Sequence, residues 1–157
     1  MAYLIFGKDE LLGAWAAKRI PHIGKPEKFG PFTAIGVATG PTAQDRLMAV
    51  IVYSCHMPEQ KTIQISAASC DPRWASRATL RDVFSVAFIE YKAFKIWAAI
   101  PHKQERVVKF TKAIGFKSEG ILRHQFGPKS HAVVCGMITT EYRKKYLPEE
   151  KLIRMEA

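Results

Sequence analysis

Cysteines are few in this sequence, and they form no recognisable pattern. Only Cys55, Cys70 and Cys135 occur among 157 residues, with no C-x-x-C pair. An odd number at wide spacing indicates neither a disulfide framework nor a zinc site, and suits a reducing compartment. The five histidines form no i, i+4 pair, so we expect no metal site.

Long apolar segments are missing as well. No run approaches the roughly 20 apolar residues of a membrane span. The first residues, MAYLIFGKDE, include no basic leader, and Asp9 and Glu10 interrupt their short apolar stretch, which is unlike a signal peptide. We therefore expect a cytoplasmic protein of a bacterial cell, with no membrane partner.

Repeats, low-complexity tracts and linkers are also absent. A chain of 157 residues has the length of one domain, which buries roughly 68–70% of its unfolded surface. The 48% hydrophobic content argues against disorder. The sequence thus predicts a single domain over residues 1–157, with 142–157 as a charged tail in which Pro148 can begin a short helix.

Acidic residues are in the minority, with 14 Asp and Glu against 24 Lys and Arg, for a net charge of +10. Such a surface attracts the phosphates of a nucleic acid or of a nucleotide cofactor, or simply keeps the protein dissolved. Arg106, Lys109 and Lys112 fall on one face of a predicted helix. They are candidate contacts for a nucleic acid, and a solvated helix face is the alternative.

Hydrophobic spacing and turn residues predict the elements. In order, they are a helix over 9–20, a long loop over 22–32, strands over 33–39, 47–56 and 62–69, a helix within 79–94, a strand over 95–100, a helix over 104–114 closed by Gly115, and strands over 118–125 and 131–140. The helix over 104–114 places Val107, Phe110 and Ile114 inward. The first three strands form an antiparallel meander. The unit 62–100 is a right-handed crossover between two parallel strands.

A polar strand end that opens into a loop and then a helix is a common seat for a phosphate. Here the loop is DPRWASRA, residues 71–78. Ser76 can stand beside a phosphate or simply cap the following helix. Trp74 can stack on a ligand or pack against the helix start.

This order of elements, with a helix that ends in Gly115-Phe116 and continues into Ser118-Glu119-Gly120, resembles the Gcn5-related N-acetyltransferase (GNAT) superfamily. The resemblance covers roughly residues 8–142. The last strand, HAVVCGMITTEY, is similar to that of the branch that acetylates ribosomal-protein N-termini. The segments FGPFTAIGV and SAASCDPRW are similar to short acetyltransferase-like proteins of phages, so a phage-encoded chain is one expectation.

The resemblance implies an α/β (α+β) fold. Its mixed, mostly antiparallel sheet is split around one parallel crossover and has helices on both faces. It also implies direct transfer of an acetyl group from acetyl-CoA, or another acyl-CoA, to an amine. The acceptor stays open between a protein N-terminus, a small amine and a nucleic acid, and the chain is expected to be a monomer or homodimer.

The resemblance also assigns residues to the cofactor site. The pantetheine arm would pair with a strand and the pyrophosphate would lie in the loop, where Ser76 replaces the family's central glycine. The cofactor residues are then Ile65, Ser66, Ala67, Ala68, Arg73, Trp74, Ala75, Ser76, Arg77, Ala78, Thr79, Gln104 and Phe110.

The same comparison gives two catalytic candidates. Gln104 stands where the family has an asparagine, and Thr111 where many relatives have a tyrosine that acts as the general acid. No glutamate matches the usual general base, so Tyr53 and His56 on the preceding strand are candidates by residue type.

Two other functions remain open from the sequence. One is modification of nucleic-acid bases on the same scaffold, as in Mom-type phage proteins, which the altered loop and the positive charge favour. The other is a non-catalytic binder of a host factor or nucleic acid, which the joint replacement of the family's Asn, Tyr and Gly favours.

Overall fold

The computed structural model describes residues 2–42 and 44–147, so the helix predicted to begin at Pro148 lies outside the described residues. The elements, in chain order, are β1 (Tyr3–Ile5), α1 (Asp9–Arg19), η1 (Pro26–Phe29), β2 (Phe32–Ala38), β3 (Leu47–Met57), β4 (Thr62–Ser69), η2 (Pro72–Trp74), α2 (Arg77–Ser85), η3 (Val86–Glu90), β5 (Lys95–Pro101), α3 (Glu105–Ala113), β6 (Lys117–Leu122), β7 (Ala132–Ile138) and α4 (Thr139–Tyr146).

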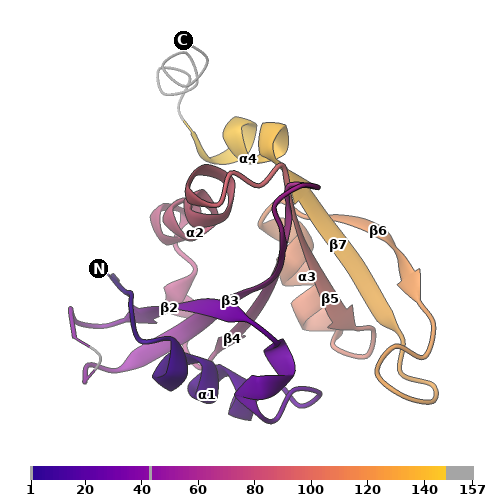
Figure 1. The fold of residues 1–157 in the computed structure, drawn as a ribbon, viewed down its shortest axis with the longest axis horizontal. Coiled ribbons are helices and arrows are strands. Elements are labelled where there is room, and N and C mark those ends of the chain that lie inside the picture. The colour runs from indigo at the N-terminus through magenta and orange to yellow at the C-terminus, as the bar shows by residue number, and fades with distance from the viewer. Residues whose placement is uncertain (1, 43, 148–157) are drawn as a thin grey trace.

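All strands belong to one seven-stranded sheet in the order β1-β2-β3-β4-β5-β7-β6 (Figure 1). Every neighbouring pair is antiparallel except β4 and β5, which run parallel. The predicted meander and the predicted parallel crossover are both confirmed.

The sheet opens between β4 and β5. These strands pair only where Thr62–Gln64 lies beside Lys95–Trp97. Beyond that point β4 stays paired with β3 up to Ser69, and β5 stays paired with β7 up to Pro101. Beyond the parallel ladder, β4 runs alongside β3 and β5 runs alongside β7. Figure 1 shows the two halves of the sheet diverging as two wings. The expected split is therefore present.

Helices cover both faces of the sheet, as predicted; Figure 1 shows α1 on one side and α2 and α4 on the other. Because side chains alternate along a strand, β3 supplies both cores. Val50 and Val52 pack with Leu12 of α1, whereas Ile51 packs with Val83 of α2. The second of these clusters extends without a break from β2 to β7.

Helix α1 lies very close to β2. A Cβ atom at Gly13 would stand only 2.4 Å from the ring of Phe32, so the absence of a side chain at Gly13 permits this approach.

The helix predicted over 104–114, α3, does not bury its apolar face as expected. Val107 and Phe110 are 44% and 39% exposed, and Thr111 is the buried residue of the helix. The spacing identified the apolar stripe, but the stripe lies beside the opening in the sheet rather than on the core. Gly115 ends α3 with a φ of +121°, as its predicted C′ position requires.

One strand and one α-helix were not predicted, namely β1 and α4. Strand β1 has only three residues, too few to show a period. Helix α4 begins where the carboxylate of Glu141 accepts a hydrogen bond of 3.0 Å from the Ile138 N–H. Tyr142 and Tyr146 are buried, so residues 142–146 are helix rather than charged tail.

The helix predicted within 79–94 also changes character. α2 gives way at Val86 to one turn of π-helix, in which the Tyr91 N–H bonds the Val86 carbonyl.

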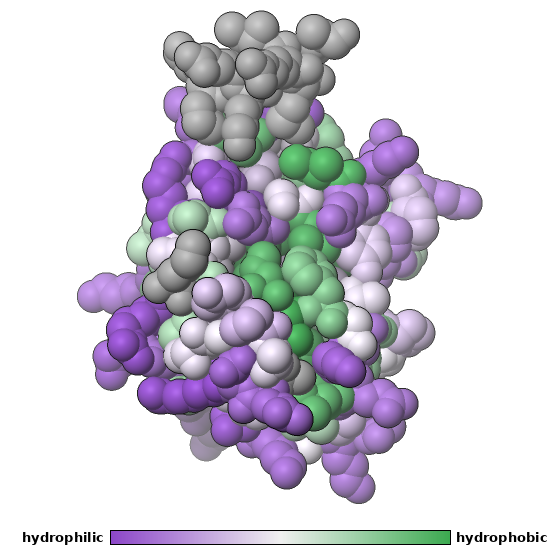
Figure 2. Space-filling model, turned by 90° about the vertical axis from the view of Figure 1, so that its left-hand side faces the viewer, coloured by the Kyte–Doolittle hydropathy of each residue, from purple (hydrophilic) through white to green (hydrophobic). Residues whose placement is uncertain are grey.

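The described part of the chain includes no helix that is long and apolar enough to cross a bilayer. Hydrophobic side chains nevertheless reach the surface, and Phe6 and Ile89 are about half exposed, at 54% and 46%. Figure 2 shows that such residues gather in a band across one face, between hydrophilic margins.

The packing of α1 gives a first prediction. Leu12 is fully buried between α1 and the sheet, whereas Leu11, its neighbour on the same helix, is 51% exposed. Leu12→Ala should lower the free energy of unfolding by about 2–5 kcal/mol, because it removes buried methyl groups and leaves a cavity. Leu11→Ala should change it by less than about 0.5 kcal/mol. Urea denaturation of both variants tests this, and equal effects would contradict the packing of α1.

Candidate functional site

The opening between β4 and β5 forms a cavity of about 450 Å³. Its wall comes from both halves of the sheet and from the elements around the opening. The lining includes Arg19–His22 at the end of α1, Ile65–Ser69 of β4, Pro72 and Trp74 of η2, Ala98–Pro101 of β5, and Gln104, Arg106, Val107, Phe110 and Thr111 at α3. The cavity therefore reaches from the α1 face of the sheet to the α3 face.

Strand β4 presents a free edge to this cavity. The predicted residues Ile65, Ser66, Ala67 and Ala68 all line it, and the ladder to β5 has already ended at Gln64. Their inward edge can therefore pair with an extended ligand that carries amide groups, as an added strand would.

The α3 wall brings three more predicted residues to the cavity. Gln104 occupies the N-cap position of α3 and makes no capping bond with its side chain. Phe110 lies with its ring centroid 6.0 Å from that of Trp74, which is buried. The Thr111 hydroxyl donates to the Val107 carbonyl at 2.8 Å, so its proton is already used within the helix.

Apart from Pro72 and Trp74, the predicted phosphate loop lies beside the cavity rather than in its wall. Arg73, Ala75, Ser76, Arg77, Ala78 and Thr79 are outside the lining. The Ser76 hydroxyl accepts a hydrogen bond of 3.2 Å from the Thr79 N–H, which is the helix-cap alternative considered for it. Helix α2 still leaves the N–H groups of its first turn, at Arg77 and Ala78, without an intrahelical acceptor.

Arg73 is engaged by a neighbouring carboxylate. Its Nε donates to both oxygens of Asp71 at 3.1 Å, and its Nη2 donates at 2.6 Å. These side-chain bonds, with one from the Arg73 backbone N–H, lower the pKa of Asp71 to about 2. Asp71 is therefore ionised at neutral pH and offsets the charge of Arg73, which leaves Arg77 as the cation of this loop that is better placed for a phosphate.

Tyr53 does not reach the cavity. It is buried, and its hydroxyl donates to the Val83 carbonyl at 2.6 Å. Burial, with the nearby Tyr91 and Glu90, raises the pKa of Tyr53 well above its ordinary value. This setting gives Tyr53 a structural role and argues against the proton-transfer role for which it was a candidate. His56 is exposed, lies edge-on against Tyr91 and is also outside the lining.

The sequence did not point to the wall made by Arg19–His22, nor to that made by Ala98–Pro101. The His22 ring lies 4.3 Å from the ring of Phe126, and its buried Nδ1 has no hydrogen-bond partner among the described residues. Burial lowers the pKa of His22. The available signal was the long Gly- and Pro-rich loop over 22–32, because loops of this kind are often functional.

Three other histidines hold the β6–β7 loop that carries Phe126. In each, the ring Nδ1 lies close to a backbone N–H. The His102 Nδ1 is 3.0 Å from the backbone nitrogen of His131, the His131 Nδ1 is 2.8 Å from that of His124, and the His124 Nδ1 is 2.9 Å from that of Lys129. An Nδ1 that accepts a hydrogen bond carries no proton, so the bonds at His124 and His131 require rings protonated at Nε2. The His102 Nδ1 also lies 3.2 Å from the His131 carbonyl oxygen, so its contacts suit either tautomer.

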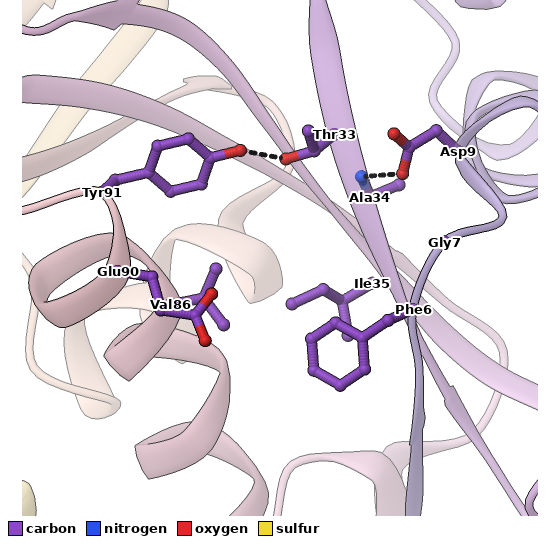
Figure 3. Close-up of a pocket in the computed structure, with 9 residues that line it drawn as sticks. All are labelled: Phe6, Gly7, Asp9, Thr33, Ala34, Ile35, Val86, Glu90 and Tyr91. Carbon is purple, nitrogen blue, oxygen red and sulfur yellow. Dashed lines mark hydrogen bonds between the residues drawn. The ribbon is translucent and has the colours of Figure 1, made fainter.

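A second cavity, of about 270 Å³, lies between the end of β1, β2 and η3 (Figure 3). Its polar groups largely satisfy one another. Asp9 accepts from the Ala34 N–H at 3.0 Å, and the hydroxyls of Thr33 and Tyr91 are 2.6 Å apart. None of the catalytic, cofactor-binding or nucleic-acid-binding residues predicted from the sequence lines this cavity. We assign it no function.

Neither the protein-family models nor the curated proteins give a match to this chain. Solved structures do resemble it. A chimera of spermidine N-acetyltransferase SpeG from Vibrio cholerae and hSSAT superposes with a TM-score of 0.69 at 13% identity, over 91% of this chain and 98% of its own. A point mutant of V. cholerae SpeG superposes with a TM-score of 0.59 at 14% identity, over 72% of this chain and 69% of its own. A candidate acetyltransferase from T. thermophilus superposes with a TM-score of 0.63 at 18% identity, over 79% of this chain and 68% of its own.

These likenesses confirm the fold implied by the sequence. The chain has the mixed, split sheet of the Gcn5-related acetyltransferases. The three neighbours give no support to the finer resemblance to the phage or ribosomal-protein branches, which stays a prediction.

The histidine bonds give a second prediction, measurable by nitrogen NMR of the imidazoles. At pH 8, His124 and His131 should both be Nε2–H tautomers. Burial, and then the nearby His124, His102, Arg123 and Lys103, lower the pKa of His131 below its ordinary value of 6.5. The unfolded chain then binds protons first on acidification, so the stability from His131 is complete above pH 6.5 and falls below it. An Nδ1–H tautomer at His124 or His131 would contradict these bonds.

Proposed function

We propose that this protein is an N-acyltransferase that moves an acetyl group, or another short acyl group, from its coenzyme A thioester to an amine. The observation that carries the proposal is the cavity at the split of the sheet, where β4 offers a free edge on the α3 side and α1 forms a wall on the opposite side. Two substrates can enter such a passage from opposite faces and meet inside it.

The free edge of β4 fits the chemistry of the cofactor. The pantetheine arm of coenzyme A includes two amide groups, which would pair with the backbone of Ile65–Ala68. Its phosphates would then extend toward the start of α2, where the N–H groups of Arg77 and Ala78 and the Arg77 guanidinium favour an anion. The apolar side chains of Val107 and Phe110 would cover the arm.

Alignment would supply most of the catalysis. Placing an amine against a thioester can contribute about 7–11 kcal/mol through proximity and orientation. The Gln104 amide and the free N–H groups of β4 are donors in the cavity that can bond the thioester oxygen as its charge develops. Thr111 would contribute packing, since its hydroxyl is engaged by Val107.

The cavity also bears on the class of acceptor. Arg19 and Arg106 line it, and the lining, as far as the structure describes it, includes no Asp or Glu. A polycation would therefore meet like charge and no counter-charge. Spermidine is the substrate named for two of the neighbours, but we propose instead an amine whose carrier is neutral or bears a carboxylate or phosphate.

The third prediction tests the cofactor site. Ala67 is exposed on β4 and lines the cavity, whereas Ala113 is exposed at the end of α3 outside it. Ala67→Glu should weaken binding of coenzyme A at least tenfold, or about 1.4 kcal/mol, because it narrows the passage and repels phosphates. Ala113→Glu adds the same charge and should leave the affinity unchanged. Calorimetry with coenzyme A measures both.

Absence of binding by the unmutated protein at millimolar coenzyme A would overturn the acyltransferase proposal. The non-catalytic and base-modification alternatives would then be tested through Arg106, Lys109 and Lys112, by their effect on salt-dependent retention of a nucleic acid.

The fourth prediction concerns the acceptor. With acetyl-CoA as donor, the dipeptide glycylglycine should be acetylated with a kcat/KM at least about tenfold above that of spermidine, because the guanidiniums of Arg19 and Arg106 disfavour a polycation. Release of coenzyme A with each amine measures this. A preference for spermidine would contradict the electrostatic argument while leaving acyl transfer intact.

A further inference from the structure

We propose that His22 is a catalytic residue, which accepts the proton that the acceptor amine must lose before it attacks the thioester. The proposal rests on the proposed acyl transfer and assigns the base that no residue of the sequence motifs supplied. Amines are mostly protonated at neutral pH, and an ammonium has no lone pair, so such a reaction needs a proton acceptor near the amine.

The composition of the cavity singles out His22. Arg19, His22 and Arg106 are the ionisable side chains in its described lining. Arginine stays protonated in proteins, so it cannot act as a base. His22 is therefore the one lining side chain, within the described residues, that can accept a proton at neutral pH.

The setting of the ring suits this role. The Nδ1 of His22 is shielded from solvent and has no hydrogen-bond partner among the described residues. Buried polar atoms are normally paired, so the unpaired Nδ1 marks a ring nitrogen that no structural hydrogen bond engages, unlike those of His102, His124 and His131. The Phe126 ring, 4.3 Å away, fixes the plane of the imidazole.

Helix α1 sets the position of His22. The helix stops at Ile20, whose carbonyl accepts bonds from the N–H groups of Ile23 and Gly24 at 3.0 and 3.2 Å. This turn presents His22 at the end of α1, on the face of the sheet opposite α3. The base would thus stand on the acceptor's side of the passage, and the free edge of β4 would hold the thioester.

The step balances as follows. A protonated primary amine gives one proton to the imidazole, which becomes imidazolium. The freed nitrogen lone pair attacks the thioester carbonyl, a C–N bond forms and the C–S bond breaks. The second amine proton leaves with the thiolate, which departs as the thiol of coenzyme A. The imidazolium then releases its proton to water.

The neighbouring charges favour a neutral base. Arg19 from α1 and Arg106 from α3 line the same cavity, and no carboxylate in its described lining would stabilise a positive ring. Burial lowers the pKa of His22 beneath 6.5, so the ring is unprotonated at neutral pH. The rate should therefore fall only as the pH drops below 6.5.

The test compares His22→Gln with His56→Gln, a matched exposed histidine outside the cavity. With acetyl-CoA and glycylglycine, His22→Gln should lower kcat/KM by about 10²–10⁴-fold and remove the acid limb of its pH profile. Coenzyme A affinity should stay within twofold, and His56→Gln should behave as the unmutated protein. NMR titration of His22 in the unmutated protein should give the pKa of that acid limb.

Other outcomes overturn the proposal in distinguishable ways. If His22→Gln keeps its rate and its acid limb, another group takes the proton and acyl transfer stands. If its affinity for coenzyme A is lost as well, or if His22 titrates away from the acid limb, the residue is structural. If the unmutated protein transfers no acetyl group, the assignment of His22 falls together with the proposed function.

Discussion

The parallel ladder between β4 and β5 ends after three residue pairs, and the rest of the molecule is arranged around that end. Beyond it, each strand keeps the hydrogen bonds of its outer neighbour, so the two halves turn away from each other with the twist of their own ladders. A sheet paired throughout would have left no passage between α1 and α3. The free edge of β4 and the cavity beside it are thus two results of one interruption.

Local signals were sufficient for most of the fold. The stripe from Leu80 to Phe88, the helix stop at Gly115 and the meander over 33–69 each depend on neighbours in sequence. The partner that covers an apolar stripe, in contrast, is not determined by neighbours in sequence. The spacing of Val107 and Phe110 is the same whether the stripe packs on a core or faces a ligand, and α3 faces the cavity. Helix α4 was within reach, because Tyr142, Tyr146 and Leu147 have helical spacing beside Glu141.

The residues of the candidate site likewise fall into those that local sequence patterns identify and those that only the fold brings together. Ile65–Ala68, Gln104 and Phe110 lie in continuous motifs, and the structure brings them to one cavity. His22 and Ala98–Pro101 join them only because α1 ends against the opening of the sheet, which no local pattern encodes. The engagement of Arg73 by Asp71 was hidden for another reason. The two residues are close together in the loop, but their pairing depends on side-chain geometry rather than on spacing.

The break in the sheet is not a break in the core. One apolar cluster runs beneath both wings, from Ile35 and Ile51 in the first half to Ile96 and Met137 in the second, with Val83 and other side chains of the crossover helix between them. Neither wing can expose its inner face without stripping the other of its packing. The protein should therefore unfold in a single cooperative transition, although its backbone hydrogen bonding falls into two nearly separate halves.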